Sequence, residues 1–235
     1  MKNRGHVLPP DFAAFSFHLD ADGGDEALVE RMLAATPGRR IAVAGAGRWS
    51  LLLALARRGA DVVAFDPSRL TLGTARDAAE NAGLMERVTF FAADPRDFVI
   101  PEGVDGALVT SFSWRVLLTR EAQAQMLECL RRAIAPGGAL CLDVDRLPPG
   151  TTAETERTLL RHGPGGQTWW WRRDPARALV TITCDAPRTG PIEVAVSDTT
   201  PEASAELMRA AGFHVARGPA SLCKRELIVG RVPLA

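Results

Sequence analysis

The sequence predicts an α/β fold in which a mostly parallel sheet carries helices and a small antiparallel sheet is inserted late in the chain. Strand-like and helix-like segments alternate from residue 25 to residue 144, as they do where helices connect parallel strands. The stretch 41–66, IAVAGAGRWSLLLALARRGADVVAFD, has the pattern strand, glycine turn, helix, strand. After Pro148-Pro149-Gly150, short strands separated by turns replace this alternation, which indicates an antiparallel insertion.

The stretch 41–66 carries the clearest functional signal. Ile41 to Ala44 are apolar without polar alternation, which is typical of a strand covered on both faces. Gly45 and Gly47 permit a tight turn and a close approach of the backbone to a ligand. Apolar residues at helical spacing follow, and the next strand ends at Asp66. Because ligands bind beyond the carboxyl ends of parallel strands, and a carboxylate there suits a ribose diol, the stretch predicts a nucleotide or nucleoside site.

The remaining elements can be placed by their caps and turns. The hydroxyls of Ser68, Thr119 and Thr200 are predicted to cap helices, the last of which has Pro201 at its first position. We expect one domain over residues 1–235, with 1–36 as an N-terminal cap segment and 163–198 as the antiparallel insertion. The predicted elements are, in chain order, helix 25–35, strand 41–44, a helix over residues 51–56, strand 61–65, helix 69–81, strands 87–92 and 105–109, helix 120–135, strands 139–144, 167–172, 179–184 and 192–197, a helix after residue 200, and a hairpin of 213–216 with 225–229.

Composition restricts the class of partner. Lys and Arg total 28 and are balanced by 28 Asp and Glu, so nothing indicates general affinity for nucleic acid or membrane surfaces. No stretch approaches the ~20 apolar residues of a membrane span, and the first residues lack the apolar run of a signal peptide. The cysteines form no CxxC pair, which favours free thiols in a reducing cytoplasm, and no spacing of His, Cys and acidic residues indicates a metal site. We therefore expect a cytoplasmic protein without a metal centre.

Five stretches follow one another in the chain: IAVAGAGRW, VVAFDPS, FFAADPRDF, LRRAIAPGGALCLDV and MRAAGFHV. In order and spacing they resemble the motifs of the class I S-adenosylmethionine (SAM) methyltransferases, from about Asp25 to the C-terminus. The resemblance implies a Rossmann-like, seven-stranded, mostly parallel sheet with an antiparallel last strand. It also implies SAM as the cofactor and methyl transfer to a small metabolite, for which an aromatic or apolar acceptor is one option.

Site residues follow from the same motifs. Asp66 is expected to bind the ribose hydroxyls, because its two carboxylate oxygens can accept from both. Asp94 is expected at the exocyclic amine of adenine. No catalytic residue can be assigned, and His18 and His162 are weak candidates for a base. The expected cofactor contacts are Gly45, Ala46, Gly47, Asp66, Pro67, Ala93, Asp94, Pro95, Thr110 and Ser111, and the expected substrate contacts are Trp49, Phe112, Trp114 and Trp170.

The run Trp169-Trp170-Trp171 admits two interpretations. In a strand Trp169 and Trp171 face one way and Trp170 the other, so both faces of the strand must be covered. One interpretation is packing on the core together with contact to a second copy, which would make a homodimer. The other is a lid over an apolar substrate.

Two positions depart from the family pattern and keep alternatives open. Val43 stands where the family usually has an acid that orients the methionine amino end, and Trp49 stands where a third glycine is common. Gly45-x-Gly47-x-x-Ser50 with Asp66 about 20 residues on also approximates the fingerprint of an NAD-linked oxidoreductase. Further alternatives are a non-methylating SAM-fold enzyme, such as a cyclase or an aminocarboxypropyl transferase, and a non-catalytic scaffold.

Overall fold

The computed structural model describes residues 25–145, 158–162, 168–186, 190–217 and 225–234. The helices among them are α2 (Asp25–Ala35), α3 (Trp49–Arg57), α4 (Arg69–Asn81), the 3-10 turn η1 (Met85–Arg87), α5 (Ser111–Arg115), α6 (Arg120–Ala133) and α7 (Pro201–Ala210). The strands are β1 (Arg40–Ala44), β2 (Asp61–Asp66), β3 (Val88–Ala92), β4 (Val104–Val109), β5 (Ile134–Asp145), β6 (Thr158–His162), β7 (Thr168–Asp174), β8 (Leu179–Ala186), β9 (Gly190–Ser197), β10 (His214–Arg217) and β11 (Arg225–Arg231).

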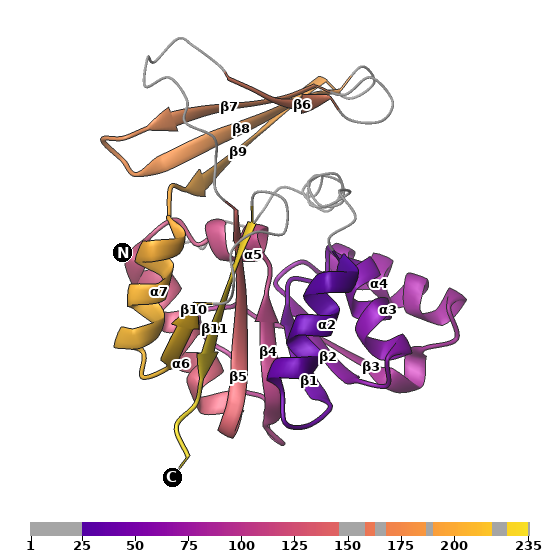
Figure 1. Ribbon diagram of the computed structural model, residues 1–235. Helices are drawn as coiled ribbons and strands as arrows, with labels where there is room; N and C mark the ends of the chain where they lie inside the picture. The colour runs from indigo at the N-terminus through magenta and orange to yellow at the C-terminus, as the bar shows by residue number, and fades with distance from the viewer. Residues whose placement is uncertain (1–24, 146–157, 163–167, 187–189, 218–224, 235) are drawn as a thin grey trace.

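A seven-stranded sheet with the order β10-β11-β5-β4-β1-β2-β3 forms the body of the molecule (Figure 1). Strands β1 to β5 pair in parallel, whereas β11 runs antiparallel to β5 and β10 antiparallel to β11. The Rossmann-like fold expected from the sequence, with its antiparallel last strand, is therefore confirmed. β1 lies near the middle of this order, so its carboxyl end and that of β2 meet at one edge.

Both faces of the sheet are buried, which explains the unbroken apolar sequence of the first strand. Ile41 and Val43 pack with α2, α3 and α4 on one face, whereas Ala42 and Ala44 pack with α5, α6 and α7 on the other. All four residues are at most 2% exposed. The alternation of side chains along the strand thus serves two separate cores. Helices cover both faces of the sheet (Figure 1).

The predicted helix caps are confirmed. The hydroxyl oxygens of Ser68, Thr119 and Thr200 accept from the backbone N–H three residues on, at 3.2 Å in each case. Most predicted boundaries shift by one or two residues, and the largest difference is at β5. It already begins at Ile134 and runs through the Pro136-Gly137-Gly138 stretch, which we predicted as a turn before the strand. Backbone hydrogen bonds from Gly137 to Val232, and from Val232 to Gly138, continue the pairing there.

A second, four-stranded antiparallel sheet has the order β6-β7-β8-β9. Three of its strands were predicted from the sequence. The fourth, β6, was not predicted, and it lies before residue 163, where we expected the insertion to begin. Trp171 lies opposite Ile182, which in turn lies opposite Val194, and all three are buried. Trp170 lies on the other face, opposite Thr183, and its exposure is intermediate.

Buried polar contacts join the second sheet to the first. Arg115 Nη1 donates to the carbonyl of Ser197 at 2.8 Å, and Gln123 Nε2 donates to the hydroxyl of Ser197 at 3.0 Å. In Figure 1 the second sheet lies above the end of the larger sheet at which α5 begins. The end of β9 is thereby fixed against α5 and the start of α6.

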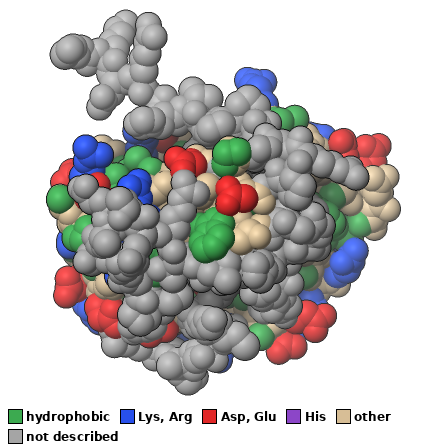
Figure 2. All heavy atoms as spheres, turned by 90° about the horizontal axis from the view of Figure 1, so that it is seen from above, with side chains coloured by type: hydrophobic (Ala, Val, Ile, Leu, Met, Phe, Trp, Pro, Cys, Tyr) green, Lys and Arg blue, Asp and Glu red, His purple; other side chains and the backbone are tan. Residues whose placement is uncertain are grey.

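Side chains of both charges are visible on the described residues. In the view from above, acidic and basic side chains both occur around the rim (Figure 2). Within the described residues no helix is long and apolar enough to cross a membrane. The same residues contain no group of three or more His, Cys, Asp or Glu that could hold a metal ion.

Candidate functional site

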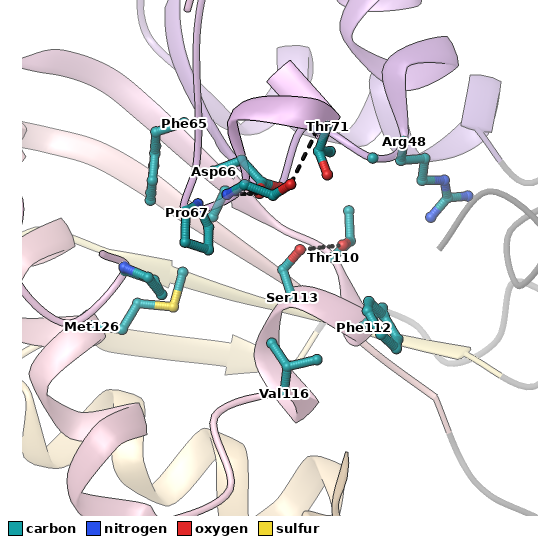
Figure 3. Close-up of a pocket in the computed structure, with 15 residues that line it drawn as sticks. Arg48, Phe65, Asp66, Pro67, Thr71, Thr110, Phe112, Ser113, Val116 and Met126 are labelled. Atoms are coloured by element: carbon teal, nitrogen blue, oxygen red, sulfur yellow. Dashed lines mark hydrogen bonds between the residues drawn. The ribbon is translucent and has the colours of Figure 1, made fainter. Parts of the chain in front are cut away.

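A pocket opens at the carboxyl ends of β1, β2 and β4 (Figure 3). It holds about 640 Å³ free of protein atoms, including the part that opens to solvent. Of the expected cofactor contacts it includes Gly45, Gly47, Asp66, Pro67, Pro95 and Thr110. Its lining is Ala44, Gly45, Gly47, Arg48, Phe65, Asp66, Pro67, Ser68, Thr71, Pro95, Thr110, Phe112, Ser113, Val116 and Met126.

The glycine turn after β1 forms one wall of the pocket. Gly45 has φ +93°, a conformation that side-chain-bearing residues rarely adopt, and its N–H donates to the carbonyl of Phe65 at 2.9 Å. A Cβ atom at Gly45 would also overlap the hydroxyl of Ser113. Both the backbone conformation and the close approach of α5 therefore require glycine here.

Asp66 is held in one orientation by the backbone around it. Its Oδ2 accepts from the N–H of Ala46 at 3.0 Å, and its Oδ1 accepts from the N–H of Ser68 at 2.8 Å. The residue is 9% exposed, and burial raises the pKa of its carboxyl above the ordinary value, against the opposing effect of the two backbone hydrogen bonds. A buried carboxylate with free lone pairs and a fixed direction is suited to accept from two neighbouring hydroxyls. Ala46 itself is fully buried and only supplies the N–H.

Asp94 has a different environment from Asp66. It forms a close ion pair with Arg96, with 2.6 Å between Asp94 Oδ2 and Arg96 Nη2, and its side chain is 43% exposed. The hydrogen bond from the Arg96 side chain lowers the pKa of Asp94. Pro95 lines the pocket, whereas Ala93 packs against the core and Asp94 is not part of the lining. The structure therefore brings only one of these three expected adenine contacts to the pocket wall.

The residues after β4 form a short helix rather than a loop. Thr110 precedes α5, and its hydroxyl lies 3.0 Å from that of Ser113, which shares the pocket wall with Phe112. Ser111, an expected contact, is buried and lies outside the lining. Successive residues of an α-helix point in directions about 100° apart, so Ser113 can line the pocket while the next residue, Trp114, is directed into the core.

Trp114 corrects the sequence interpretation. We expected it on a loop at the substrate, but it is fully buried, and its indole Nε1 donates to the hydroxyl of Ser204 at 3.0 Å. It packs within the core on the side of α6 and α7. Its role is structural: it fixes α5 against α7.

Trp49 and Trp170, the other expected substrate tryptophans, also lie outside the lining. Trp49 is partly buried and packs against the core on the side of α2 and α3. Trp170 lies in β7 on the face that carries the exposed residues Arg172 and Glu193. The buried face of the second sheet carries Trp171 instead.

The side chains of the two weak candidates for a catalytic base are not placed relative to the pocket. His18 lies outside the described residues, and His162 is placed in β6 by its backbone while its side chain lies outside what is described. Cys223 also lies outside the described residues, whereas Cys129, Cys141 and Cys184 are free and buried.

Several lining residues were missed by the sequence analysis. Ser113, Val116 and Met126 come from α5, the turn after it and α6. Arg48 is buried, and its Nη1 lies 3.5 Å from Oδ2 of Asp143 on β5, which is equally buried. Arg48 directly follows Gly47, and this position in the sequence could have identified it as a pocket residue. Nothing in the sequence near Met126 distinguishes it from the other apolar residues of its helix.

The lining has two dissimilar ends, and this fits an elongated nucleoside with a charged arm. In Figure 3, Phe65, Pro67 and Met126 lie on one side of the Thr110–Ser113 pair, and Arg48 and Phe112 lie on the other. The first end is apolar and adjoins Asp66, as a flat base next to a ribose requires. At the glycine turn, the absence of a side chain at position 45 lets the hydroxyl of Ser113 approach the backbone.

Both the sequence and the fold were compared with those of known proteins. Residues 41–138 match the family model of a methyltransferase domain. None of the curated proteins matched the sequence significantly.

Solved structures extend the similarity over nearly the whole chain. The CcbJ methyltransferase from Streptomyces caelestis superposes with a TM-score of 0.74 at 15% identity, covering 89% of this chain and 90% of that one. CalS10 from Micromonospora echinaspora, an amino pentose methyltransferase described with SAM bound, gives 0.67 at 20% identity over 94% and 95%. The glycopeptide N-methyltransferase MtfA in complex with SAM gives 0.65 at 18% identity over 95% and 96%. At these identities the likeness establishes a shared fold.

Proposed function

We propose that this chain, which shares its fold with solved SAM-dependent methyltransferases and matches a methyltransferase-domain model over residues 41–138, transfers the methyl group of SAM to a small-molecule acceptor. The observation that carries the proposal is Asp66, a buried carboxylate held by two backbone N–H groups in the pocket at the end of β2. Desolvation of a carboxylate is unfavourable, so its retention in the pocket wall is best explained by hydrogen-bond donors on a ligand.

Different lining residues would bind different parts of SAM. Asp66 would accept from the ribose hydroxyls, and Phe65, Pro95 and Met126 would enclose the adenine ring in apolar contacts. Gly45 would let the backbone approach the methionine arm. SAM supplies an activated methyl group on a positively charged sulfur. What this chain must add is alignment of the acceptor with that methyl group and exclusion of water.

The chemistry of the acceptor is proposed from the pocket residues of α5 and of the turn after it. Phe112 and Val116 form an apolar wall there, which favours an acceptor with an apolar or aromatic portion. The described relatives act on an amino pentose and on a glycopeptide nitrogen, according to their descriptions. An amine that is neutral when it attacks needs no base from the protein. We therefore place a small amine first among acceptors and a hydroxyl second.

Recognition of the acceptor is assigned to the second sheet. Residues added to a fixed scaffold at the ligand edge commonly set specificity. The end of β9 is bonded to α5 and α6, and α5 carries the pocket residues Phe112 and Ser113. Of the two interpretations of the tryptophan run, a lid would use the face of Trp171 rather than that of Trp170.

The test is product analysis with purified protein. Incubation with SAM and a panel of small amines, hydroxyl compounds and aromatic acceptors should release S-adenosylhomocysteine only in the presence of an acceptor. The Asp66→Ala variant serves as the control for an unrelated methyltransferase in the preparation. Release of methylthioadenosine would instead indicate transfer of the aminocarboxypropyl arm. Binding of NAD with no binding of SAM would overturn the proposal.

A further inference from the structure

Arg48 places a positive charge at the end of the pocket away from the apolar base site. It follows Gly47 directly, lines the pocket, and has a side chain that is 3% exposed. In Figure 3 it lies on the opposite side of the Thr110–Ser113 pair from Phe65 and Met126. The part of a ligand that reaches Arg48 is therefore not the part that reaches the apolar end.

Asp143, the ion-pair partner of Arg48, lies on the same face of the sheet as Val43 of β1. Asp143 is two residues beyond Cys141, which pairs with Leu108, and Leu108 pairs with Val43. Alternation of side chains puts Asp143 on the same face as Cys141, Leu108 and Val43, which share one core cluster. Arg48 Nη1 lies 3.5 Å from Asp143 Oδ2, and the Asp143 side chain is 4% exposed.

Stability alone does not explain a buried ion pair in this position. Removing two charges from water is costly, and apolar residues of similar size often serve a fold as well or better. A pair whose cation lines a pocket has a second use, because the cation can bind a ligand anion while the buried anion beside it neutralises its charge in the empty site. Guanidinium groups suit carboxylates in particular, since they donate two parallel hydrogen bonds.

We propose that Arg48 binds the carboxylate of the methionine arm of SAM and that Asp143 is its positioning residue, supplying from β5 the acid that this chain lacks at Val43. The inference rests on the cofactor of the proposed function. The adenosine portion of SAM is uncharged at neutral pH, and the carboxylate is the only anionic group of the molecule. A buried arginine at the far end from the base site therefore has one matching partner on this ligand.

The first experiment varies the ligand and leaves the protein intact. Calorimetry would compare SAM, decarboxylated SAM and 5′-methylthioadenosine on the wild-type protein. Decarboxylated SAM keeps the sulfonium and the amine and lacks only the carboxylate. We expect it to bind ~10- to 100-fold more weakly than SAM, as for loss of a hydrogen bond between charged groups. Equal affinity for SAM and decarboxylated SAM would overturn the inference.

The second experiment varies the protein. Arg48→Met or Asp143→Leu alone would leave an uncompensated buried charge, so the two substitutions are combined. The double variant should keep its thermal transition, bind SAM ~10- to 100-fold more weakly, and bind 5′-methylthioadenosine as the wild type does. Arg48→Lys, which keeps the charge, should lose less affinity for SAM. Arg57→Met, at the exposed last residue of the helix α3 that Arg48 precedes, is the matched control.

The outcomes separate this inference from the proposed function. If the double variant loses SAM and 5′-methylthioadenosine equally, the pair only shapes the pocket and the inference falls, while the nucleoside site stands. If it keeps full affinity for SAM, the inference falls as well. A wild-type protein that binds neither ligand would overturn the cofactor assignment and this inference with it.

Discussion

The glycine turn between β1 and α3 and the four-stranded sheet β6-β7-β8-β9 illustrate two ways of placing functional side chains. In the turn, backbone geometry sets each position: Gly45 has a left-handed conformation, and Asp66 is held by the N–H groups of Ala46 and Ser68. In the sheet, positions depend on which face is covered, as the buried Trp171 and the half-buried Trp170 show. The first arrangement suits an invariant ligand such as a cofactor. If acceptor recognition lies in the second sheet, as we propose, it can change without altering the backbone of the glycine turn.

The largest effect in this comparison is expected from Gly45→Ala. The left-handed conformation costs a non-glycine residue about 1–3 kcal/mol of folding free energy, and the new Cβ would overlap the Ser113 hydroxyl. We expect SAM binding to become undetectable by calorimetry, with a lowered melting temperature. The control is Gly73→Ala in α4, where a Cβ meets nothing within 4 Å and should stabilise the helix by about 0.5–1 kcal/mol. Unimpaired binding by Gly45→Ala would show that the turn does not contact the ligand closely.

A smaller and more local effect is expected in the second sheet. Trp171 is 1% exposed, so Trp171→Ala should lower the free energy of unfolding by ~3–5 kcal/mol. Trp170→Ala, on the other face, should cost clearly less, and SAM affinity should survive in both variants. Denaturant titration and calorimetry give the two readouts. If the two substitutions cost the same, our assignment of the faces is wrong.

The mildest perturbation is a change of pH. Burial raises the pKa of Asp66, so the folded protein holds this proton more tightly than the unfolded chain does. Its contribution to stability therefore grows as the pH falls through the raised pKa towards the ordinary value of 3.8, and is lost as the pH rises again. Binding of ribose hydroxyls needs the ionised form. We expect SAM affinity to fall on acidification at a higher pH than an ordinary Asp would give, and Asp66→Asn to remove this dependence. Parallel profiles for the two proteins would contradict the assignment.

The same comparison explains how much the sequence could predict. Strand ends, helix caps and the place of Asp66 follow from local patterns, because the backbone at each position is set by its neighbours. Trp114 could not be placed, since its hydrogen-bond partner Ser204 lies 90 residues away and α5 was not expected as a helix. Asp143 was likewise hidden: its proximity to Arg48 depends on the order of the strands. The alternation within Trp169-Trp170-Trp171 was clear, but the buried face depends on packing between distant segments.

Titration calorimetry of S-adenosylhomocysteine against wild type, Asp66→Ala and Asp94→Ala tests the central assignment most directly. Asp66→Ala would remove the hydrogen bonds that the ribose hydroxyls donate to the carboxylate. The dissociation constant of this variant should therefore rise ~10- to 100-fold. Asp94 is more exposed, and its carboxylate forms an ion pair with Arg96. Asp94→Ala should therefore change the dissociation constant only a few-fold, by about 1 kcal/mol or less. An Asp66→Ala protein that keeps its thermal transition and binds with unchanged affinity would contradict the account.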